Sequence, residues 1–177
     1  MEGDEVTVGG GPATRPVVTV REPAWRPSPK ARLLWAASAA LAWIPPIVAQ
    51  GVWVLVAPGA PLWHIAAAAA TLVLGGLHVV VVPIWRFRVH RWEMDDTAVY
   101  TRSGWWTQER RVAPISRIQT VDTERGPLDR RLGLATVTVT TASAAGAVEI
   151  AALDSTVADE TVARLTALAA GTETDAT

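Results

Sequence analysis

The sequence of 177 residues contains no cysteine. Disulfide bonds, thiolate nucleophiles and zinc sites built on cysteine are therefore excluded. The formal net charge is only −1, so the overall charge gives no indication of nucleic-acid binding. Charge is also missing locally, because no Asp, Glu, Lys or Arg occurs between Leu33 and Trp85.

A turn sequence, Pro58-Gly59-Ala60-Pro61, divides this charge-free run. The two segments, about 33–57 and 62–85, each exceed the about 20 helical residues that cross about 30 Å of hydrocarbon. A buried hairpin in a soluble protein is the alternative, but the remaining chain is too short to cover two helices that are apolar on every face. The first segment also exceeds the about 7 to 15 apolar residues of a signal peptide. The sequence therefore predicts a transmembrane helical hairpin within residues 31–86.

Basic residues precede the first predicted helix and follow the second, whereas the connecting turn carries no charge. Loops on the cytoplasmic side of a membrane are enriched in Lys and Arg. We therefore expect a multi-pass protein with both termini in the cytoplasm. The flanking residues are Arg15, Arg21, Arg26, Lys30, Arg32, Arg86, Arg88 and Arg91.

Two residue pairs lie at matching depth inside the hairpin. Pro45-Pro46 should kink the first helix because proline lacks an amide donor, and Gly75-Gly76 lets another backbone approach the second helix closely. We expect the proline segment to pack on the glycines. His64 and His78 lie about 21 Å apart along one helix and cannot share a metal ion. His64 is expected at the outer turn, and His78 with Gln50 in hydrogen bonds between the helices.

After the hairpin the sequence changes to short alternating runs rich in Val and Thr, a pattern typical of half-buried strands. Six strands and a final helix over about 156–169 are predicted, and a helix with one apolar stripe can cover the open end of a curled sheet. We therefore expect residues 87–170 to form an antiparallel β half-barrel, built as a meander and capped by a C-terminal helix. The expected strands are Phe87–Met94, Ala98–Arg102, Trp105–Val112, Ile115–Thr123, Leu134–Thr141 and Ala147–Leu153.

The two ends of the chain are expected to be flexible tails. Residues 1–30 are rich in Gly and Pro and show little apolar periodicity, so they cannot form a core. Residues 171–177 are interpreted in the same way. A short alternation at Val17–Val20 could add a strand to a sheet edge, although a solvated linker is the simpler interpretation.

Two neighbouring motifs carry a family resemblance, Pro114-Ile115-Ser116-Arg117-Ile118-Gln119-Thr120-Val121 and Arg125-Gly126-Pro127-Leu128-Asp129-Arg130-Arg131-Leu132-Gly133-Leu134. An Ile-Gln core, a Gly-x-Leu turn and an Arg-x-Leu-Gly-Leu segment before a Val-rich strand resemble the bacterial PH-like domain of the second type, in the YdbS-like membrane-flanked family. The resemblance covers about residues 30–170. It implies a PH-like fold, a location in the bacterial plasma membrane and no known catalytic activity.

The motif residues are expected to act structurally. Gly133 can adopt backbone angles closed to other residues, and the leucines can anchor the turn in the core. The residues assigned this role are Ile118, Gln119, Gly126, Leu128, Leu132, Gly133 and Leu134.

Arginines of the domain are candidate contacts for anionic lipid headgroups, which attract cations beside a membrane. Interleaved acidic residues offer an alternative, a solvated and mutually paired surface. Trp105-Trp106 is a second candidate, because neighbouring strand residues face opposite sides and one ring is left as a docking point. A cross-strand pair packed within the domain is the alternative for these rings. The candidate arginines are Arg86, Arg88, Arg91, Arg110, Arg111, Arg130 and Arg131.

No nucleophile, base and orienting group converge in the motif. We therefore expect a protein that is not an enzyme and has no cofactor, metal, nucleic-acid partner or small-molecule substrate. The leading hypothesis is a membrane-anchored PH-like module that binds a protein partner, or a second copy of itself, at the inner face of the plasma membrane. The alternatives are a sensor of anionic lipids and, more remotely, a subunit of a transporter or membrane enzyme.

Overall fold

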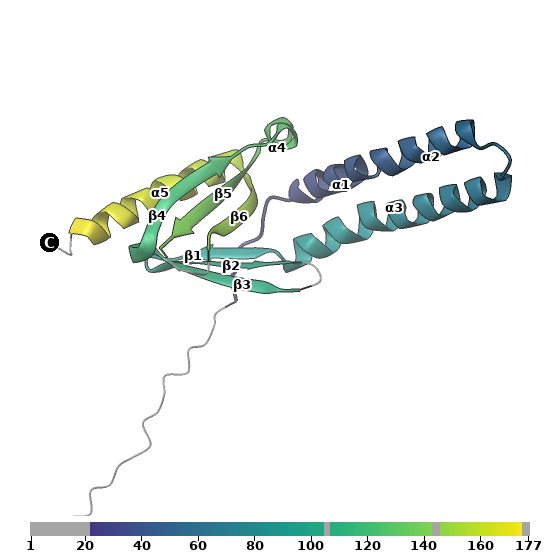
Figure 1. Cartoon of the computed structure of the whole chain (residues 1–177). Coiled ribbons are helices and arrows are strands. Elements are labelled where there is room, and N and C mark those ends of the chain that lie inside the picture. Colours follow the sequence, from purple (N-terminus) through teal and green to yellow (C-terminus); the bar gives the residue numbers. More distant parts are fainter. Residues whose placement is uncertain (1–21, 105–106, 143–145, 175–177) are drawn as a thin grey trace, which may run out of the picture.

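The computed structural model describes residues 22–104, 107–142 and 146–174. Figure 1 shows a long helical hairpin that projects from one end of a β domain. The helices of the hairpin are α1 (Ala31–Ala42), α2 (Ile44–Val56) and α3 (Pro61–Val89). The domain contains β1 (Arg91–Met94), β2 (Ala98–Ser103), β3 (Glu109–Pro114), a 3-10 turn (Ile115–Arg117), β4 (Ile118–Glu124), α4 (Pro127–Leu132), β5 (Leu134–Thr141), β6 (Val148–Asp154) and α5 (Ser155–Thr174).

The hairpin contains two helical runs that are long and apolar enough to cross a membrane. These runs, Ala31–Val56 and Pro61–Val89, have mean hydropathies of 1.8 and 2.3. Of the most apolar 18-residue stretch in each run, only 6% and 0%, respectively, is buried inside the protein. Because such a large apolar surface is unfavourable in water, the hairpin needs lipid around it, as the sequence predicts.

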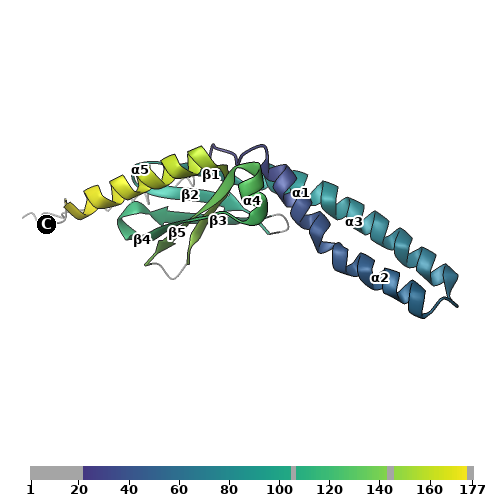
Figure 2. The same cartoon turned by 90° about the horizontal axis from the view of Figure 1, so that it is seen from above.

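The first of these runs is interrupted at Trp43, which ends α1 and precedes α2. Pro45 and Pro46 lie in the first turn of α2, where their missing amide donors cost no intrahelical hydrogen bond. Figure 2 shows the resulting change of direction between α1 and α2, while α3 runs alongside both. The interruption therefore lies where the proline pair predicts a kink.

The contacts across the hairpin differ in detail from the expected proline–glycine packing. The side chain nearest to Gly75 is the Trp43 ring, whose Cδ2 lies 3.2 Å from the position of a Cβ at Gly75, whereas a Cβ at Gly76 would meet nothing within 4 Å. Trp43 Nε1 donates a hydrogen bond to His78 Nδ1 (3.1 Å). The tryptophan thus occupies the space that glycine leaves, because its indole also satisfies a polar partner on the facing helix.

Gln50 and His64, two further polar side chains of the hairpin, also make hydrogen bonds. Gln50 Nε2 donates to the Thr71 hydroxyl, which links α2 to α3. His64 Nε2 lies 2.8 Å from the Ala57 carbonyl oxygen at the outer turn, with its ring against Trp53. Both results agree with the expected roles of Gln50 and His64, since polar groups within a bilayer require partners from the protein.

The six strands form two three-stranded antiparallel sheets, in the orders β1-β2-β3 and β4-β5-β6. The expected single meander is therefore wrong at the link between β3 and β4. There the chain forms a 3-10 turn, and Ile115 turns into the core with 2% of its surface exposed. The sheets pack against each other as a curled, open structure, and no closed barrel forms within the described residues.

Several boundaries also differ from the sequence prediction, and β3 spans Glu109–Pro114 where Trp105–Val112 was expected. Residues 87–89 are helical, because Phe87 and Val89 are buried on α3, and short apolar runs do not distinguish a helix from a strand. The expected turn after Gly126 is the helix α4, which begins at Pro127 and ends at Gly133. Gly133 has φ +67°, a left-handed conformation, which agrees with the expectation that it adopts backbone angles closed to other residues.

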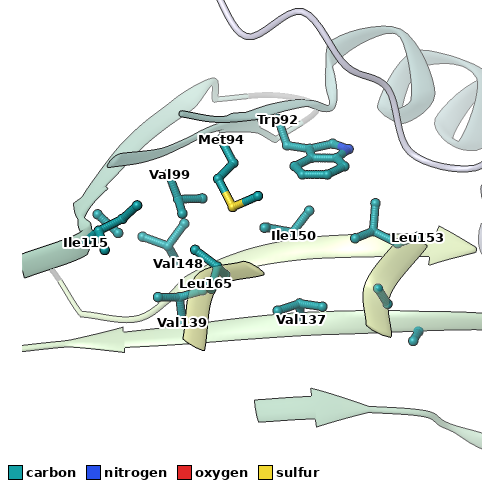
Figure 3. Close-up of a cluster of buried hydrophobic side chains, with 13 residues drawn as sticks. Trp92, Met94, Val99, Ile115, Val137, Val139, Val148, Ile150, Leu153 and Leu165 are labelled. Atoms are coloured by element: carbon teal, nitrogen blue, oxygen red, sulfur yellow. The ribbon is translucent and has the colours of Figure 1, made fainter. Parts of the chain in front are cut away.

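Between the two sheets lies the main hydrophobic core, which α5 covers (Figure 3). Val137, Val139 and Leu165 are fully buried and Ile150 nearly so. The C-terminal helix therefore closes the sheet as predicted. Its buried stripe contains Ala158 and Leu165, whereas Val157 is exposed.

A second hydrophobic cluster joins the hairpin to the domain. It combines side chains from α1 and α3 with Leu134 of β5 and Ala152 of β6. Leu128 and Leu132 of α4 pack against it, so all three predicted anchor leucines lie at this junction. The hairpin members are Ala31, Leu34, Trp35 and Phe87.

Both expected tails are shorter than predicted. Trp25 and Trp92 exchange two backbone hydrogen bonds of 2.9 Å, and Ser28 N donates to the Ala152 oxygen (3.0 Å). Residues 22–30 therefore lie on the domain, since β1 offers them an unpaired edge. At the other end, α5 continues to Thr174. Val17–Val20 and Trp105-Trp106 lie outside the described residues.

We predict that Gly75→Leu destabilises the hairpin and that Gly76→Leu does not. A leucine at position 75 must displace the Trp43 ring, which lies 3.2 Å from the Cβ position, whereas position 76 is open. Overpacking of this kind costs about 1–3 kcal/mol. Unfolding of the full chain by SDS titration, followed by circular dichroism, measures the difference. Equal midpoints for the two variants would contradict the packing described here.

Candidate functional site

Two cavities lie at the junction between the hairpin and the β domain and share part of their lining. One cavity of about 510 Å³ lies between the end of α3, β2, β3 and β6. The other, of about 360 Å³, lies between α1, the start of α4, β5 and β6. Arg86, Glu149 and Ala151 line both cavities. We call the two together the membrane-proximal groove, because the charge-free apolar run ends at Trp85, next to Arg86.

Arg86 is the central cation of this groove. Its guanidinium carbon lies 4.5 Å from the centroid of the Trp35 ring, in a cation–π contact. Among the described residues no carboxylate forms a direct ion pair with Arg86, although the charge of Glu149 acts on it. A half-buried guanidinium without a bonded anion retains unused hydrogen-bond donors.

His90 follows α3 directly and lies on the wall of the first cavity. It is buried, and its Nδ1 donates to the Arg86 carbonyl oxygen (3.2 Å). Burial and the nearby Arg86 charge lower the pKa of His90 to about 4. The imidazole is therefore neutral at physiological pH and contributes no positive charge to the groove.

The remaining charged residues of the groove are mostly acidic. Arg111 is already engaged, because it donates to Glu109 Oε1 (2.8 Å) and to the Ala147 carbonyl oxygen (2.7 Å). Asp129 Oδ2 accepts the Gly126 amide (3.0 Å) and so stabilises the start of α4. The two other carboxylates are Glu124 and Glu149. The lining thus carries two arginines and four carboxylates.

No group of three or more His, Asp or Glu among the described residues could hold a metal ion. In the described lining, no serine or threonine hydroxyl is hydrogen-bonded to His90.

A family model for the bacterial PH domain matches residues 33–169. The chain belongs to the bacterial PH domain family. The match includes most of the hairpin together with the β domain and α5. Two packed antiparallel sheets closed by a C-terminal helix agree with a PH-like fold.

A curated relative is the UPF0699 transmembrane protein YdbS of Bacillus subtilis (strain 168). It is 34% identical over 84 residues, which are 47% of this chain and 53% of the relative. The chain thus spans about half the length of the curated relative it matches. No solved structure matches. With the two apolar helices, these findings identify a YdbS-like membrane protein that carries a bacterial PH domain.

The PH domain distributes the predicted arginines over separate surfaces. Arg86 and Arg111 face the groove, whereas Arg110 lies on the outer face of β3 and pairs with Glu22 (3.4 Å). Neighbouring strand residues point to opposite sides of a sheet, so Arg110 and Arg111 cannot act together. The other predicted arginines are Arg88, exposed on α3, Arg91 at the start of β1, and Arg130 and Arg131, exposed on α4.

The motif of the resemblance is structural in the PH domain, as expected. Leu134 is fully buried, and Ile118 packs against the main core. Gly126 precedes α4 and donates its amide to Asp129. Gln119 is exposed where the pairing of β4 with β5 shifts its register, so this side chain points away from the core.

Sequence analysis missed the acidic side of the groove. Glu124 and Glu149 belong to different strands, and Trp35, which stacks on Arg86, belongs to α1. No local pattern connects these positions, because only the docking of α1 on the PH domain brings them together. A signal did exist for Arg86, the first charged residue after the apolar run.

Acidification is predicted to destabilise the protein through His90. The pKa of His90 is about 4 in the fold, below the ordinary histidine value of 6.5, so the unfolded chain binds the proton more readily between these two pH values. The contribution of neutral His90 to the free energy of unfolding is therefore fully present above pH 6.5. About 3 kcal/mol is lost as the pH decreases to about 4. Thermal unfolding in detergent from pH 7.5 to 4 measures the loss. A His90→Gln variant should lack this component, and an equal loss in the variant would rule out His90 as its source.

Proposed function

We propose that this YdbS-like protein is a non-enzymatic membrane anchor that presents its PH domain at the cytoplasmic face for protein–protein interaction or assembly. The observation that carries the proposal is the fixed attachment of the PH domain to the hairpin. Trp35 and Phe87 of the hairpin share one hydrophobic cluster with Leu134 and Ala152 of the domain. A domain held in this way offers its surfaces in a constant orientation to the membrane, which suits an assembly role.

Polar contacts reinforce the attachment. Ser28 N donates to the Ala152 oxygen (3.0 Å), and Lys30 Nζ lies 3.3 Å from Asp154 Oδ1. The exposed Lys30–Asp154 pair adds little stability by itself. It does link the start of the hairpin to the end of β6, close to the hydrophobic cluster.

A candidate docking surface lies on the outer face of the first sheet. Val112 of β3 is 49% exposed there and lies beside Tyr100 of β2 in the strand register. Among the described strands, β3 pairs only with β2, so its other edge is available for strand addition. Arg102 and Arg110 frame this face. An apolar centre with a charged rim is typical of protein interfaces.

The cytoplasmic placement rests on charge distribution. Lys30, Arg32, Arg86 and Arg88 lie at the domain end of the hairpin, whereas the turn between α2 and α3 has no charge. Positive residues favour the cytoplasmic side during membrane insertion. This supports a PH domain inside the cell, beside the inner leaflet.

A photoreactive residue at Val112 is predicted to capture a discrete protein partner in the native membrane, because this position is exposed on the proposed surface. The same residue at Ala167, exposed on α5, is the matched control. Mass spectrometry of the purified adducts distinguishes a partner from a second copy of the chain.

Charge reversal tests the specificity of this capture. Arg110→Glu should abolish the Val112 adduct, whereas Arg164→Glu should leave it unchanged; both arginines are exposed and ion-paired, to Glu22 and Asp96 respectively. An adduct that survives Arg110→Glu, or one that is also obtained from Ala167, would count against the proposed surface.

Contact with anionic lipids is a second candidate function, favoured by the position of α4. This helix lies beside α1 at the membrane-facing end of the domain (Figure 1). Arg130 and Arg131 are exposed on it and form no ion pair among the described residues. Juxtamembrane arginines gain about 1 kcal/mol each near an anionic surface.

In nanodiscs, we predict slower amide hydrogen exchange in α4 when the lipid contains phosphatidylglycerol than when it is phosphatidylcholine alone. The protection should decrease with added salt, since the attraction is screened. Replacing Arg130 and Arg131 by Gln should remove it, whereas Arg110→Gln, on the far sheet face, should not. Equal exchange in both lipids would exclude this contact.

A further inference from the structure

The membrane-proximal groove has an electrostatic composition that suits a ligand carrying both charges. Arg86 supplies guanidinium donors that no described carboxylate occupies. Glu124 and Glu149 line the second cavity and are exposed, and no side-chain hydrogen bond or ion pair within the described residues involves their carboxylates. The surplus of carboxylates would repel a ligand with only negative charge, and Arg86 would repel a ligand with only positive charge.

The position of the groove indicates where such a ligand comes from. The second cavity is lined by Leu34, Trp35 and Ser38 of α1, the helix that leads into the membrane. One turn further along α1, Leu41 is exposed on the apolar surface of the hairpin. A molecule in the groove could therefore place a polar end between the carboxylates and Arg86 while its apolar part follows the hairpin.

We propose that the membrane-proximal groove binds the headgroup of an ethanolamine phospholipid from the adjacent leaflet. The phosphodiester accepts hydrogen bonds from Arg86, and the primary ammonium donates to Glu124 and Glu149. This site goes beyond the proposed assembly role and does not depend on it.

Trp35 gives the site part of its preorganisation. Its ring lies 4.5 Å from the Arg86 guanidinium carbon and thereby holds the cation between the two cavities. A guanidinium stacked on one face keeps its in-plane N–H groups free for a phosphate. Cavities of about 360 and 510 Å³ give ample room for an ethanolamine headgroup.

Other abundant headgroups match the groove less well. Phosphatidylcholine has a quaternary ammonium without N–H donors, so it cannot hydrogen-bond to the carboxylates. Phosphatidylglycerol has no ammonium and carries a net negative charge, which the carboxylates repel. The ethanolamine headgroup combines a phosphate with a hydrogen-bonding ammonium. Comparison with phosphatidylcholine therefore tests the N–H donors of the ammonium, and comparison with phosphatidylglycerol tests the ammonium itself.

Native mass spectrometry of the full chain in detergent tests the proposal, using the three lipids with identical acyl chains at equal concentrations. We expect the ethanolamine lipid to be retained about tenfold more than either competitor, the effect of one or two charge-assisted hydrogen bonds. Arg86→Gln should reduce its retention about tenfold, and so should the double replacement of Glu124 and Glu149 by Gln. Equal retention of the three lipids would overturn the proposal.

Matched controls separate the site from general charge effects. Arg88→Gln removes an exposed arginine from the same helix, and Glu160→Gln removes an exposed carboxylate from α5; neither residue lines the groove, so neither should change retention. If Arg86→Gln fails to fold, as judged by circular dichroism, the carboxylate variants still decide the outcome, because Glu124 and Glu149 are exposed. Unchanged retention in those variants would overturn the site.

The soluble headgroup distinguishes a membrane lipid from a free metabolite. Glycerophosphoethanolamine presents the same phosphodiester and ammonium without acyl chains. It should fail to displace the lipid at equal concentration, because it lacks the apolar contact along the hairpin. Displacement at equal concentration would overturn the assignment to a leaflet lipid.

Discussion

The hydrophobic cluster between the hairpin and the PH domain is the contact on which the rest of the structure depends. It takes Ala31 and Trp35 from the entry of the first helical run and Phe87 from the exit of the second, and packs them on Leu134 and Ala152. Burial of apolar surface is the dominant favourable term in such a junction. Because both ends of the hairpin enter one cluster, the sheets cannot turn independently of the membrane helices.

This junction also gives the groove its chemistry. The same docking that buries Trp35 and Phe87 places Arg86 in the lining of two cavities that also carry carboxylates. A charged side chain next to apolar surface keeps its head group in a polar environment while its stem is covered. Structural attachment and a polar, membrane-facing cavity are therefore consequences of one packing arrangement.

Sequence patterning was most informative where each residue's environment followed from its neighbours in the chain. Leu134–Thr141 alternates strictly, and β5 has these same bounds. Prediction failed where a local pattern fitted two structures: 87–89 continues α3 instead of starting a strand, and 127–132 is a helix instead of a turn. In both places the residues pack at the junction: Phe87 belongs to the junction cluster and Leu132 packs against it, both from helical segments.

The sequence alone determined the membrane hairpin, the number of strands and the capping helix, because hydropathy and periodicity are properties of consecutive residues. Membership of the bacterial PH domain family was likewise visible in two neighbouring motifs of the sequence. The division into two sheets, the partner of Gly75 and the acidic wall opposite Arg86 were decided only by the tertiary structure. Each depends on contacts between distant segments, such as α1 against β6, and the physical reason is that such contacts leave no periodic trace in either segment.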